Sequence, residues 1–308
     1  MIMMPQNQYS KQVNIVIDYI LLNLEKPLFV DELSKLTTLS TFHFHRIFTH
    51  EVGESIAKFI LRKRLELAAI ILVDNLLKTV TNISYEVGFS SVNVFCRNFK
   101  KHFGITAEVY RNTSKQQDSK NSQLKRKDNT LERSYSHYFC SDKSFINIKG
   151  DKKMECKFEI KELPELHVVY CRHYGAYDLM QDAYGKLIEW ALPRGLMMPE
   201  SKLLSVYHDN PEVTKVENLI SDACLIVDTF IKTDGGINAR TIAGGTFAVG
   251  RFEIAMEEFP QAWQCVFQLL AEHGCQIAGV GYEIYHNNRD EHPERKWIVD
   301  ICIPVMPK

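Results

Sequence analysis

Apolar residues recur at helical spacing through the first third of the chain. Between residues 10 and 24 they fall at three- and four-residue intervals, which predicts an amphipathic helix that Pro27 ends. A short second helix follows, and Ser40 is placed to cap a third helix that ends at Gly53. A long helix is expected over about 55–75. The pattern therefore predicts an all-α N-terminal domain.

Residues 81–104 repeat the plan of residues 30–53. Each segment predicts a short helix, a turn, and a second helix with aromatic and basic residues that ends at a glycine. An offset of 51 residues aligns FHRIFTHEVG with FCRNFKKHFG, so that Arg46 matches Arg97. Tandem helix-turn-helix units fit a protein that reads two segments of the DNA major groove about 34 Å apart. The alternative is two similar helices in an ordinary bundle.

The C-terminal half changes to alternating strands with turn residues and two helices. Its plan also recurs. An offset of 79 residues aligns HVVYCRHY with TFAVGRFE, and an offset of 78 aligns VYHDN with IYHNN. The expected fold is an α+β domain of duplicated strand-helix-strand-strand units. A groove between the two halves is a common place for a ligand.

Residues 112–153 separate the two halves and are rich in Lys, Ser, Asn, Asp and Gln. They are interpreted as a basic linker, flexible at least over 114–130. Apolar residues return from Tyr135 onward, which predicts an added strand or helix that docks on one of the domains. The expected domains are therefore 1–111, the linker 112–153, and 154–308.

Charge is distributed unevenly along the chain. Residues 1–111 carry 13 Lys and Arg against 10 Asp and Glu, whereas residues 154–308 carry 14 against 23. A basic front favours a polyanionic partner. The Arg62-Lys63-Arg64 run of the long helix is interpreted as a solvated face, with one contact to a DNA phosphate as the functional alternative.

Several classes of protein are disfavoured by composition. No apolar run approaches the roughly 20 residues of a membrane span, and the start lacks the pattern of a secretory signal. The eight cysteines show no metal-binding spacing, so we expect reduced, mostly structural thiols in a cytoplasmic protein. No cofactor and no metal are expected, and no Ser-His-Asp or Cys-His spacing indicates covalent catalysis.

The N-terminal part, over about residues 9–111, resembles the DNA-binding domain of AraC/XylS transcription regulators. The resemblance rests on the first helix-turn-helix, the linking helix RKRLELAAIILVDN, and the signature ISYEVGFSSVNVFCRNFKKHFG. The family usually has Ala where this chain has Ser34 and Ser84, and Pro where it has Ala107. The resemblance implies double-stranded DNA as a partner and RNA polymerase as a further one.

The resemblance also implies which side chains enter the major groove. The first reading helix would present Phe42, His45 and Arg46. The second would present Val92, Asn93, Val94 and Arg97. Arg can pair with guanine, Asn with adenine, and Val or Phe can contact a thymine methyl. The alternatives are a surface histidine at position 45, and phosphate or intramolecular contacts for the two arginines.

Residues 154–308 resemble the GyrI-like effector-binding domain, which implies a small, often cationic or hydrophobic, effector. The resemblance rests on I-x-x-L-P at 160–164, EWALPRGL, AGGTFAVGRF, and YEIY before KWIVDICIPV. It places the central acid at Glu283, whose alternative is a solvated acid on an edge strand. One carboxylate among aromatic rings suits an organic cation. Candidate walls are Tyr285, Tyr207, Trp263 and Trp297, and plain core packing is the alternative for the two tryptophans.

Strand alternation distinguishes the two tyrosines that flank this acid. It would place Glu283 and Tyr285 on one face of the sheet and Tyr282 on the other. The favoured function is a transcription regulator that binds DNA and a small-molecule effector and is not an enzyme. The alternatives are a C-terminal domain that hydrolyses small electrophiles with Glu283 as general base, or one that binds another protein.

Overall fold

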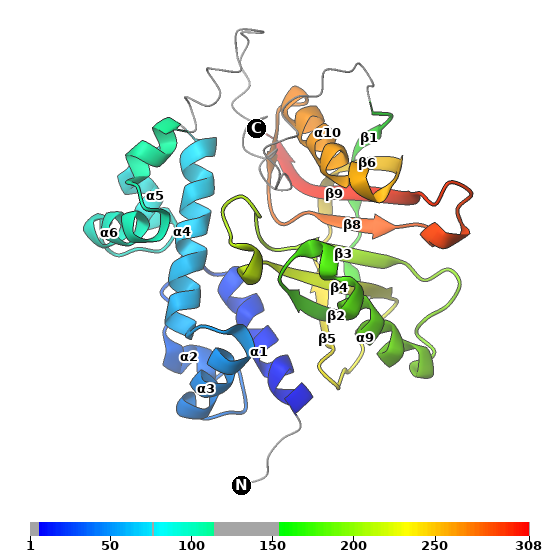
Figure 1. Ribbon diagram of the computed structural model, residues 1–308, viewed down its shortest axis with the longest axis horizontal. Coiled ribbons are helices and arrows are strands. Elements are labelled where there is room, and N and C mark those ends of the chain that lie inside the picture. Colours follow the sequence, from blue (N-terminus) through cyan, green and yellow to red (C-terminus); the bar gives the residue numbers. More distant parts are fainter. Residues whose placement is uncertain (1–5, 76, 114–153, 308) are drawn as a thin grey trace. The chain divides into compact units, whose positions relative to one another are not determined.

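The computed structural model describes residues 6–75, 77–113 and 154–307, which fall into two compact units, one toward each end of the chain (Figure 1). The N-terminal unit is helical and the C-terminal unit is α+β, as the sequence predicts. The predicted linker and the docking element expected from Tyr135 lie almost wholly outside the described residues. The domain boundaries at 111 and 154 therefore stay predictions.

Six helices form the N-terminal unit, and residues 107–113 add a further helical segment. The six are α1 (Gln6–Leu21), α2 (Val30–Ser34), α3 (Thr41–Val52), α4 (Ile56–Asp74), α5 (Val80–Glu86) and α6 (Val92–Phe103).

The first helix ends earlier than the apolar pattern predicts. α1 stops at Leu21, and the chain turns before Pro27 instead of continuing the helix to it. The Arg64 side chain of α4 donates to the backbone carbonyls of Leu24 and Lys26, over 2.9 and 2.6 Å. These carbonyls are thereby satisfied outside a helix, a tertiary contact that local periodicity does not reveal.

Helix boundaries in the two reading segments follow the predicted capping. The Ser40 side chain accepts from the backbone N–H of His43, and α3 ends at Gly53 with φ 79°. α6 ends in the same way at Gly104, also with φ 79°, a left-handed conformation that glycine adopts without steric cost. Ser91 occupies the N-cap of α6 without a side-chain capping bond, so its contribution is smaller than that of Ser40.

Aromatic rings build the core of this unit. Phe44 and Phe48 of α3 are fully buried, and Phe48 meets Phe59 of α4 in an edge contact at 5.6 Å between ring centroids. Phe95 and Phe99 of α6 are equally buried. Each reading helix thus anchors one aromatic face in the core, so its opposite face is presented to solvent.

Two buried serines stand where the resembled family has alanine. The hydroxyl of Ser34 donates to the carbonyl of Asp31 over 2.9 Å, and that of Ser84 donates to the carbonyl of Thr81 over 2.7 Å. Bonding back to the preceding turn satisfies a hydroxyl that would otherwise be buried unpaired. The N-terminal unit therefore accommodates serine in place of alanine in both of its helix-turn-helix segments.

The interpretation of Arg62-Lys63-Arg64 as a solvated face is wrong. Arg62 is 7% exposed and Lys63 is 4% exposed. Arg62 pairs with Glu54 at 2.6 Å and with Glu66 at 3.2 Å. Arg62 and Lys63 are therefore buried and Arg64 is partly buried, so charge alone misassigned the run.

An antiparallel sheet forms the C-terminal unit, with the order β1-β6-β9-β8-β3-β4-β2-β5, and β7 pairs with β9 (Figure 1). Its strands are β1 (Lys157–Leu163), β2 (Leu166–Tyr174), β3 (Leu203–Tyr207), β4 (Ile220–Val227), β5 (Asn238–Ile242), β6 (Gly245–Ile254), β7 (Cys275–Ile277), β8 (Tyr282–Tyr285) and β9 (Trp297–Pro307). Its helices are α9 (Gln181–Ala191), extended by a 3₁₀ turn to Arg194, and α10 (Phe259–Glu272).

The two helices pack on the same face of this sheet. Leu187 and Trp190 of α9 pack with Val169 and Leu225, and Trp263 and Val266 of α10 pack in a second cluster with residues of β6 and β9. The opposite face has its own apolar core, built from strand residues that include Tyr170 and Tyr282. α9 therefore packs over β2 and β4, and α10 packs over β6 and β9, so the two helices lie on either side of the central strands β3 and β8.

Two similar ionic clusters lie on the face of the sheet opposite α9 and α10. Arg172 forms a double hydrogen bond with Asp222 at 2.8 and 3.0 Å, and His208 contacts the same carboxylate at 2.7 Å. Arg251 and His286 contact Asp300 in the same arrangement, at 2.5, 2.7 and 2.8 Å. Asp222 also pairs with Arg240 at 3.0 Å, so its cluster has a second guanidinium beyond the guanidinium and imidazole that both clusters share.

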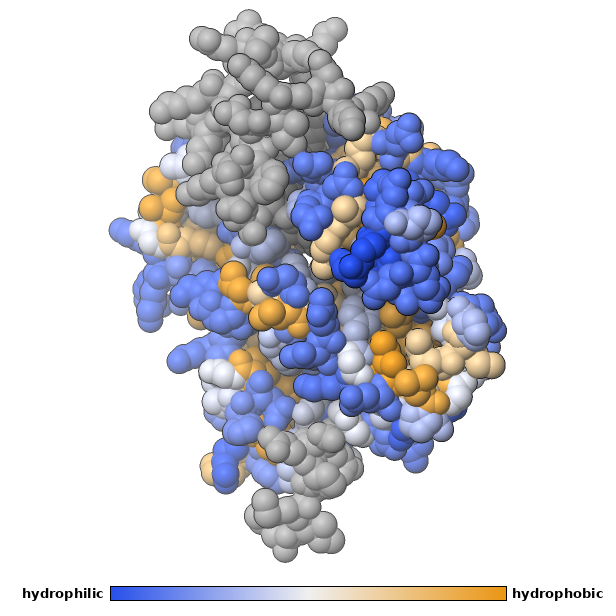
Figure 2. All heavy atoms as spheres, turned by 45° about the vertical axis from the view of Figure 1, so that its right-hand side comes forward, coloured by the Kyte–Doolittle hydropathy of each residue, from blue (hydrophilic) through white to orange (hydrophobic). Residues whose placement is uncertain are grey.

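The face of the molecule drawn in Figure 2 is mainly hydrophilic, with hydrophobic side chains in separate small groups. No helix in the described part of the chain is both long and apolar enough to cross a membrane.

Candidate DNA-reading helices and effector site

The structure places the predicted reading residues of α3 on its solvent face. Phe42 is 75% exposed, although it is a large aromatic residue, and His45 and Arg46 are exposed beside it. An apolar ring on a protein surface is the kind of group that contacts a thymine methyl. His43, one residue away, instead packs against Tyr9 at 5.6 Å between ring centroids.

α6 presents a matching surface. Asn93, Val94 and Arg97 are exposed, whereas Val92, in the first turn, is half-buried. The last turn of this helix carries Lys100 and Lys101, both exposed and suited to phosphate contacts.

One exposed residue on α6 was missed from the sequence. Cys96 is an exposed free thiol, and the 51-residue offset matches it with His45. The prediction that the cysteines are mostly structural does not hold at this position. Exposure could have been expected, because Cys96 lies outside the Phe95–Phe99 stripe and one turn from the polar Asn93 and Lys100.

Glu283 lies at the centre of the candidate effector site and is only 1% exposed. Its Oε2 accepts from the hydroxyl of Tyr285 at 2.5 Å and from that of Tyr207 at 2.9 Å. Its Oε1 accepts from the indole N–H of Trp263 at 2.6 Å. We call these four residues the carboxylate cluster. The alternative of a solvated edge acid is wrong, because β8 is central in the sheet.

The predicted strand alternation is confirmed at this position. Glu283 and Tyr285 meet on the helix-covered face, while Tyr282 packs against Phe247 on the opposite face. Trp297 joins the site through Tyr285, whose ring centroid is 5.0 Å from that of the indole. The four predicted wall residues therefore lie together. Tyr207, Tyr285 and Trp263 bond to the carboxylate, and Trp297 packs against the ring of Tyr285.

The ionisation of the cluster is governed by burial. Burial raises the pKa of Glu283, and the hydrogen bonds from Tyr285, Trp263 and Tyr207 oppose this shift in part. Burial also raises the pKa of Tyr207 and Tyr285 well above the ordinary value, and the nearby Glu283 raises both further. The phenols therefore stay neutral donors, and the carboxylate is the group whose charge can change.

Two further residues of the site were missed from the sequence. Ser205 of β3 is 1% exposed, and its Oγ lies 2.7 Å from the hydroxyl of Tyr184 and 3.0 Å from that of Tyr285. Tyr184 belongs to α9 and also donates to the carbonyl of Leu204. The 78-residue offset matches Ser205 with Glu283, a signal available in the sequence once the repeat is known.

Gly281 makes room for the indole of the cluster. A Cβ at this position would lie 2.9 Å from the Trp263 ring, closer than carbon atoms normally approach. Gly281, immediately before YEIY, therefore leaves the space in which Trp263 of α10 contacts Glu283.

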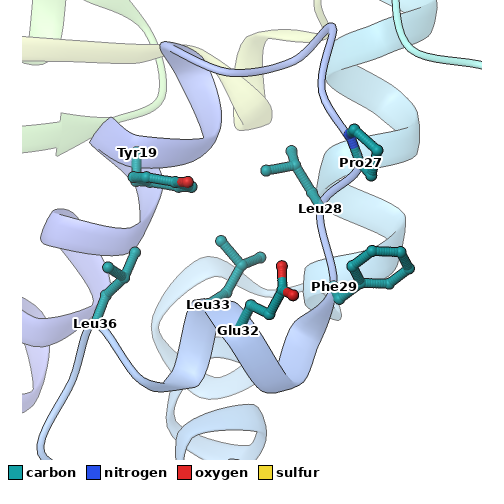
Figure 3. Close-up of a pocket in the computed structure, with 7 residues that line it drawn as sticks. All are labelled: Tyr19, Pro27, Leu28, Phe29, Glu32, Leu33 and Leu36. Atoms are coloured by element: carbon teal, nitrogen blue, oxygen red, sulfur yellow. The ribbon is translucent and has the colours of Figure 1, made fainter.

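A small pocket in the N-terminal unit is not a candidate effector site. It lies between α1, the following loop and α2, and holds about 50 Å³ (Figure 3). Its lining residues are Tyr19, Pro27, Leu28, Phe29, Glu32, Leu33 and Leu36. Sites for organic ligands are several times larger. Among the described residues, no group of three or more His, Cys, Asp or Glu could hold a metal ion.

Comparison with known proteins identifies both units. Residues 33–113 match a family model described as a helix-turn-helix domain, and residues 157–306 match one described as a GyrI-like small molecule binding domain. The multiple antibiotic resistance protein MarA of Escherichia coli (strain K12) is 29% identical over 116 residues, 37% of this chain and 90% of MarA.

Relatives of the C-terminal unit are found separately. DNA gyrase inhibitor 2 of Dickeya dadantii (strain 3937) is 29% identical over 137 residues, 43% of this chain and 85% of the inhibitor. A crystal structure of the EcmrR C-terminal domain matches 50% of this chain and all of that domain, with 20% identity and a TM-score of 0.42. The chain therefore carries an AraC-type helix-turn-helix domain joined to a GyrI-like small-molecule-binding domain, the two parts of a DNA-binding transcription regulator.

Proposed function

We propose that the regulator senses an organic cation, which it binds against Glu283, and that the exposed faces of α3 and α6 read its DNA site. The observation that carries the effector proposal is the carboxylate cluster. An acid that is 1% exposed is held among three aromatic hydrogen-bond donors, and among the residues that the structure describes it forms no ion pair with a basic side chain.

The chemistry of this cluster favours a cation with apolar surface. An ionised carboxylate in a site of low polarity attracts a positive charge more strongly than the same group in water. The faces of Tyr207, Tyr285 and Trp263 add cation–π attraction and cover apolar parts of a ligand. A weakly hydrated organic cation loses little on leaving water, so it suits this site better than a small inorganic ion.

We infer that the C-terminal unit consists of two duplicated halves. The strand order reads the same from both ends when β1 is matched with β5, β2 with β6, β3 with β8, and β4 with β9. The registers agree: Leu163 pairs with Gly245 and Leu166 pairs with Ile242, each residue 79 positions from its counterpart. The two Arg-Asp-His clusters support the same relation, and Glu283 lies at the boundary between the halves.

Hydrolysis of a small electrophile is the second candidate function. The raised pKa of Glu283 suits a general base, which is the observation that favours it. A base must reach a water molecule beside its substrate, whereas both oxygens of this carboxylate already accept bonds from side chains. Sensing is therefore the better-supported function, and turnover of an epoxide or ester would favour the enzyme.

RNA polymerase is included among the proposed partners. A DNA-bound regulator changes transcription by contacting the polymerase or by occluding its site, so effector binding must alter one of these. Binding of another protein by the C-terminal unit is the remaining alternative.

The test is a calorimetric titration of the full chain with tetraphenylphosphonium. We expect Glu283→Gln, which keeps the shape but removes the charge, to weaken binding by at least about tenfold. Tyr282→Phe is the matched control, because this residue lies on the opposite face of the sheet and should leave affinity unchanged. Equal binding by wild type and Glu283→Gln would refute the carboxylate as anchor.

A further inference from the structure

The centre of the effector site carries charge on one side only. The register between β3 and β8 pairs Ser205 directly with Glu283, and each of the two side chains is 1% exposed. Directly opposed residues of antiparallel strands have their Cβ atoms roughly 5 Å apart. An acid and a neutral hydroxyl thus occupy facing positions at the middle of the sheet.

The surroundings of these two residues match closely. Tyr207 follows Ser205 by two positions and Tyr285 follows Glu283 by two positions, on the same two strands. The hydroxyl of Tyr184, from α9, lies 2.7 Å from Ser205, and the indole N–H of Trp263, from α10, lies 2.6 Å from Glu283. The same framework of one helix residue and one tyrosine therefore holds an acid in one half and a hydroxyl in the other.

We propose that this pairing makes the protein selective for effectors with a single positive charge, and that Ser205 is the residue that sets this limit. The proposal rests on the function proposed for Glu283. One carboxylate can compensate one cationic group. In the described part of the chain, Tyr184 and Tyr285 hydrogen-bond to Ser205 and offer a second cationic group their hydroxyls but no carboxylate. Burying a charge without a counter-charge is strongly unfavourable.

The three tyrosines are consistent with this assignment. Glu283 is the acidic residue whose charge raises the pKa of Tyr184, Tyr207 and Tyr285 alike. Its field therefore reaches across both halves of the site. An effector with one charged end and a neutral, hydrogen-bond-accepting or aromatic remainder would match both halves at once.

Two synthetic ligands, titrated into the full chain, test the proposed selectivity for a single positive charge. The dication has two triphenylphosphonium groups joined by an alkylene chain. The monocation is the same molecule with one phosphonium replaced by a neutral phosphine oxide. Titration calorimetry should show that wild type binds the monocation at least as tightly as the dication, apart from a statistical factor of about two. A dication that binds wild type about tenfold more tightly overturns the proposal.

A substitution at Ser205 provides the second measurement. Ser205→Asp places a second carboxylate opposite Glu283 and should raise the ratio of dication to monocation affinity at least about tenfold at about pH 8. Ser205→Ala is the matched control and should leave that ratio unchanged. If circular dichroism shows that Ser205→Asp does not fold, the wild-type comparison alone decides.

The two proposals fail in different ways. Monocation binding that is equal in wild type and Glu283→Gln overturns the proposed function and this inference with it. Binding that depends on Glu283 but favours the dication in wild type overturns only the assignment of Ser205. If the ratio of dication to monocation affinity is unchanged in a folded Ser205→Asp variant, the assignment of Ser205 is likewise overturned.

Discussion

Arg46 and Arg97 occupy matched exposed positions on the two reading helices. If they read guanine, replacing either by alanine should cost about 1–3 kcal/mol of specific DNA affinity and relax sequence preference. Gel-shift titrations at one fixed salt concentration would measure this. Lys101→Ala, on the last turn of α6, is the control and should weaken binding to all sequences alike. Unchanged specificity in both arginine variants would assign them to phosphate contacts instead.

Glu283 should make effector binding dependent on pH. Because burial raises its pKa, the carboxylate takes up a proton at a higher pH than an exposed glutamate does. A permanent organic cation should therefore bind progressively more weakly as pH falls toward and below the raised pKa of Glu283. Calorimetry at each pH would show this slope in wild type and a flat profile in Glu283→Gln. A flat profile in wild type would mean that the acid stays ionised throughout.

Single residues were predictable where a periodic pattern or a motif fixed their surroundings. Alternation along YEIY placed Glu283 and Tyr285 together, and the helical stripe left Phe42 exposed. Ser205 was missed because a lone serine carries no chemical signal until its strand partner is known. Arg62 was misjudged because burial of a charge depends on partners from neighbouring turns and loops.

At the scale of elements, the N-terminal half of α4 carries a buried charge network. Arg62 is 8% exposed at its side chain and contacts both Glu54 and Glu66. Arg62→Ala removes the guanidinium that pairs with the buried Glu66 and the partly buried Glu54. Lys63 stays 3.9 Å from Glu66, so the substitution should destabilise the N-terminal unit by up to about 3–5 kcal/mol. Urea denaturation followed by helical circular dichroism would measure the loss.

The control for this network lies on the same helix. Lys58 is exposed one turn before Arg62, and Lys58→Ala should change the free energy of unfolding by less than about 0.5 kcal/mol. Similar stability of both variants would contradict a structural role for Arg62 and would reopen the possibility of a phosphate contact.

The positions of helices and strands along the chain were predicted better than the tertiary contacts and strand pairings between them. Capping at Ser40 and the glycine ends at Gly53 and Gly104 are local, so the sequence reveals them. The end of α1 depends on Arg64, forty residues downstream of Leu24, and could not be seen locally. Strand order is non-local as well, although the repeat offsets contained the information that relates one half to the other.

At the scale of the whole molecule, the effector chemistry belongs to one unit. The side chains that touch the Glu283 carboxylate come from β3, β8 and α10, all within residues 157–306. An isolated 154–308 fragment should therefore bind tetraphenylphosphonium within about twofold of the full chain. Calorimetry of both proteins would check this. Loss of binding in a folded fragment would mean that the N-terminal unit contributes to the site.

The long sequence separation between paired strands has a consequence for synthesis. Among the described strands β1 pairs with β6 alone, whose first residue is Gly245, so β1 is synthesised more than 80 residues before its partner. β2 in turn waits for β5 to cover its edge. A chain that stops before β5 therefore exposes unpaired strand edges at β1 and β2. The C-terminal unit should therefore fold only after translation has passed β6, late and as a whole.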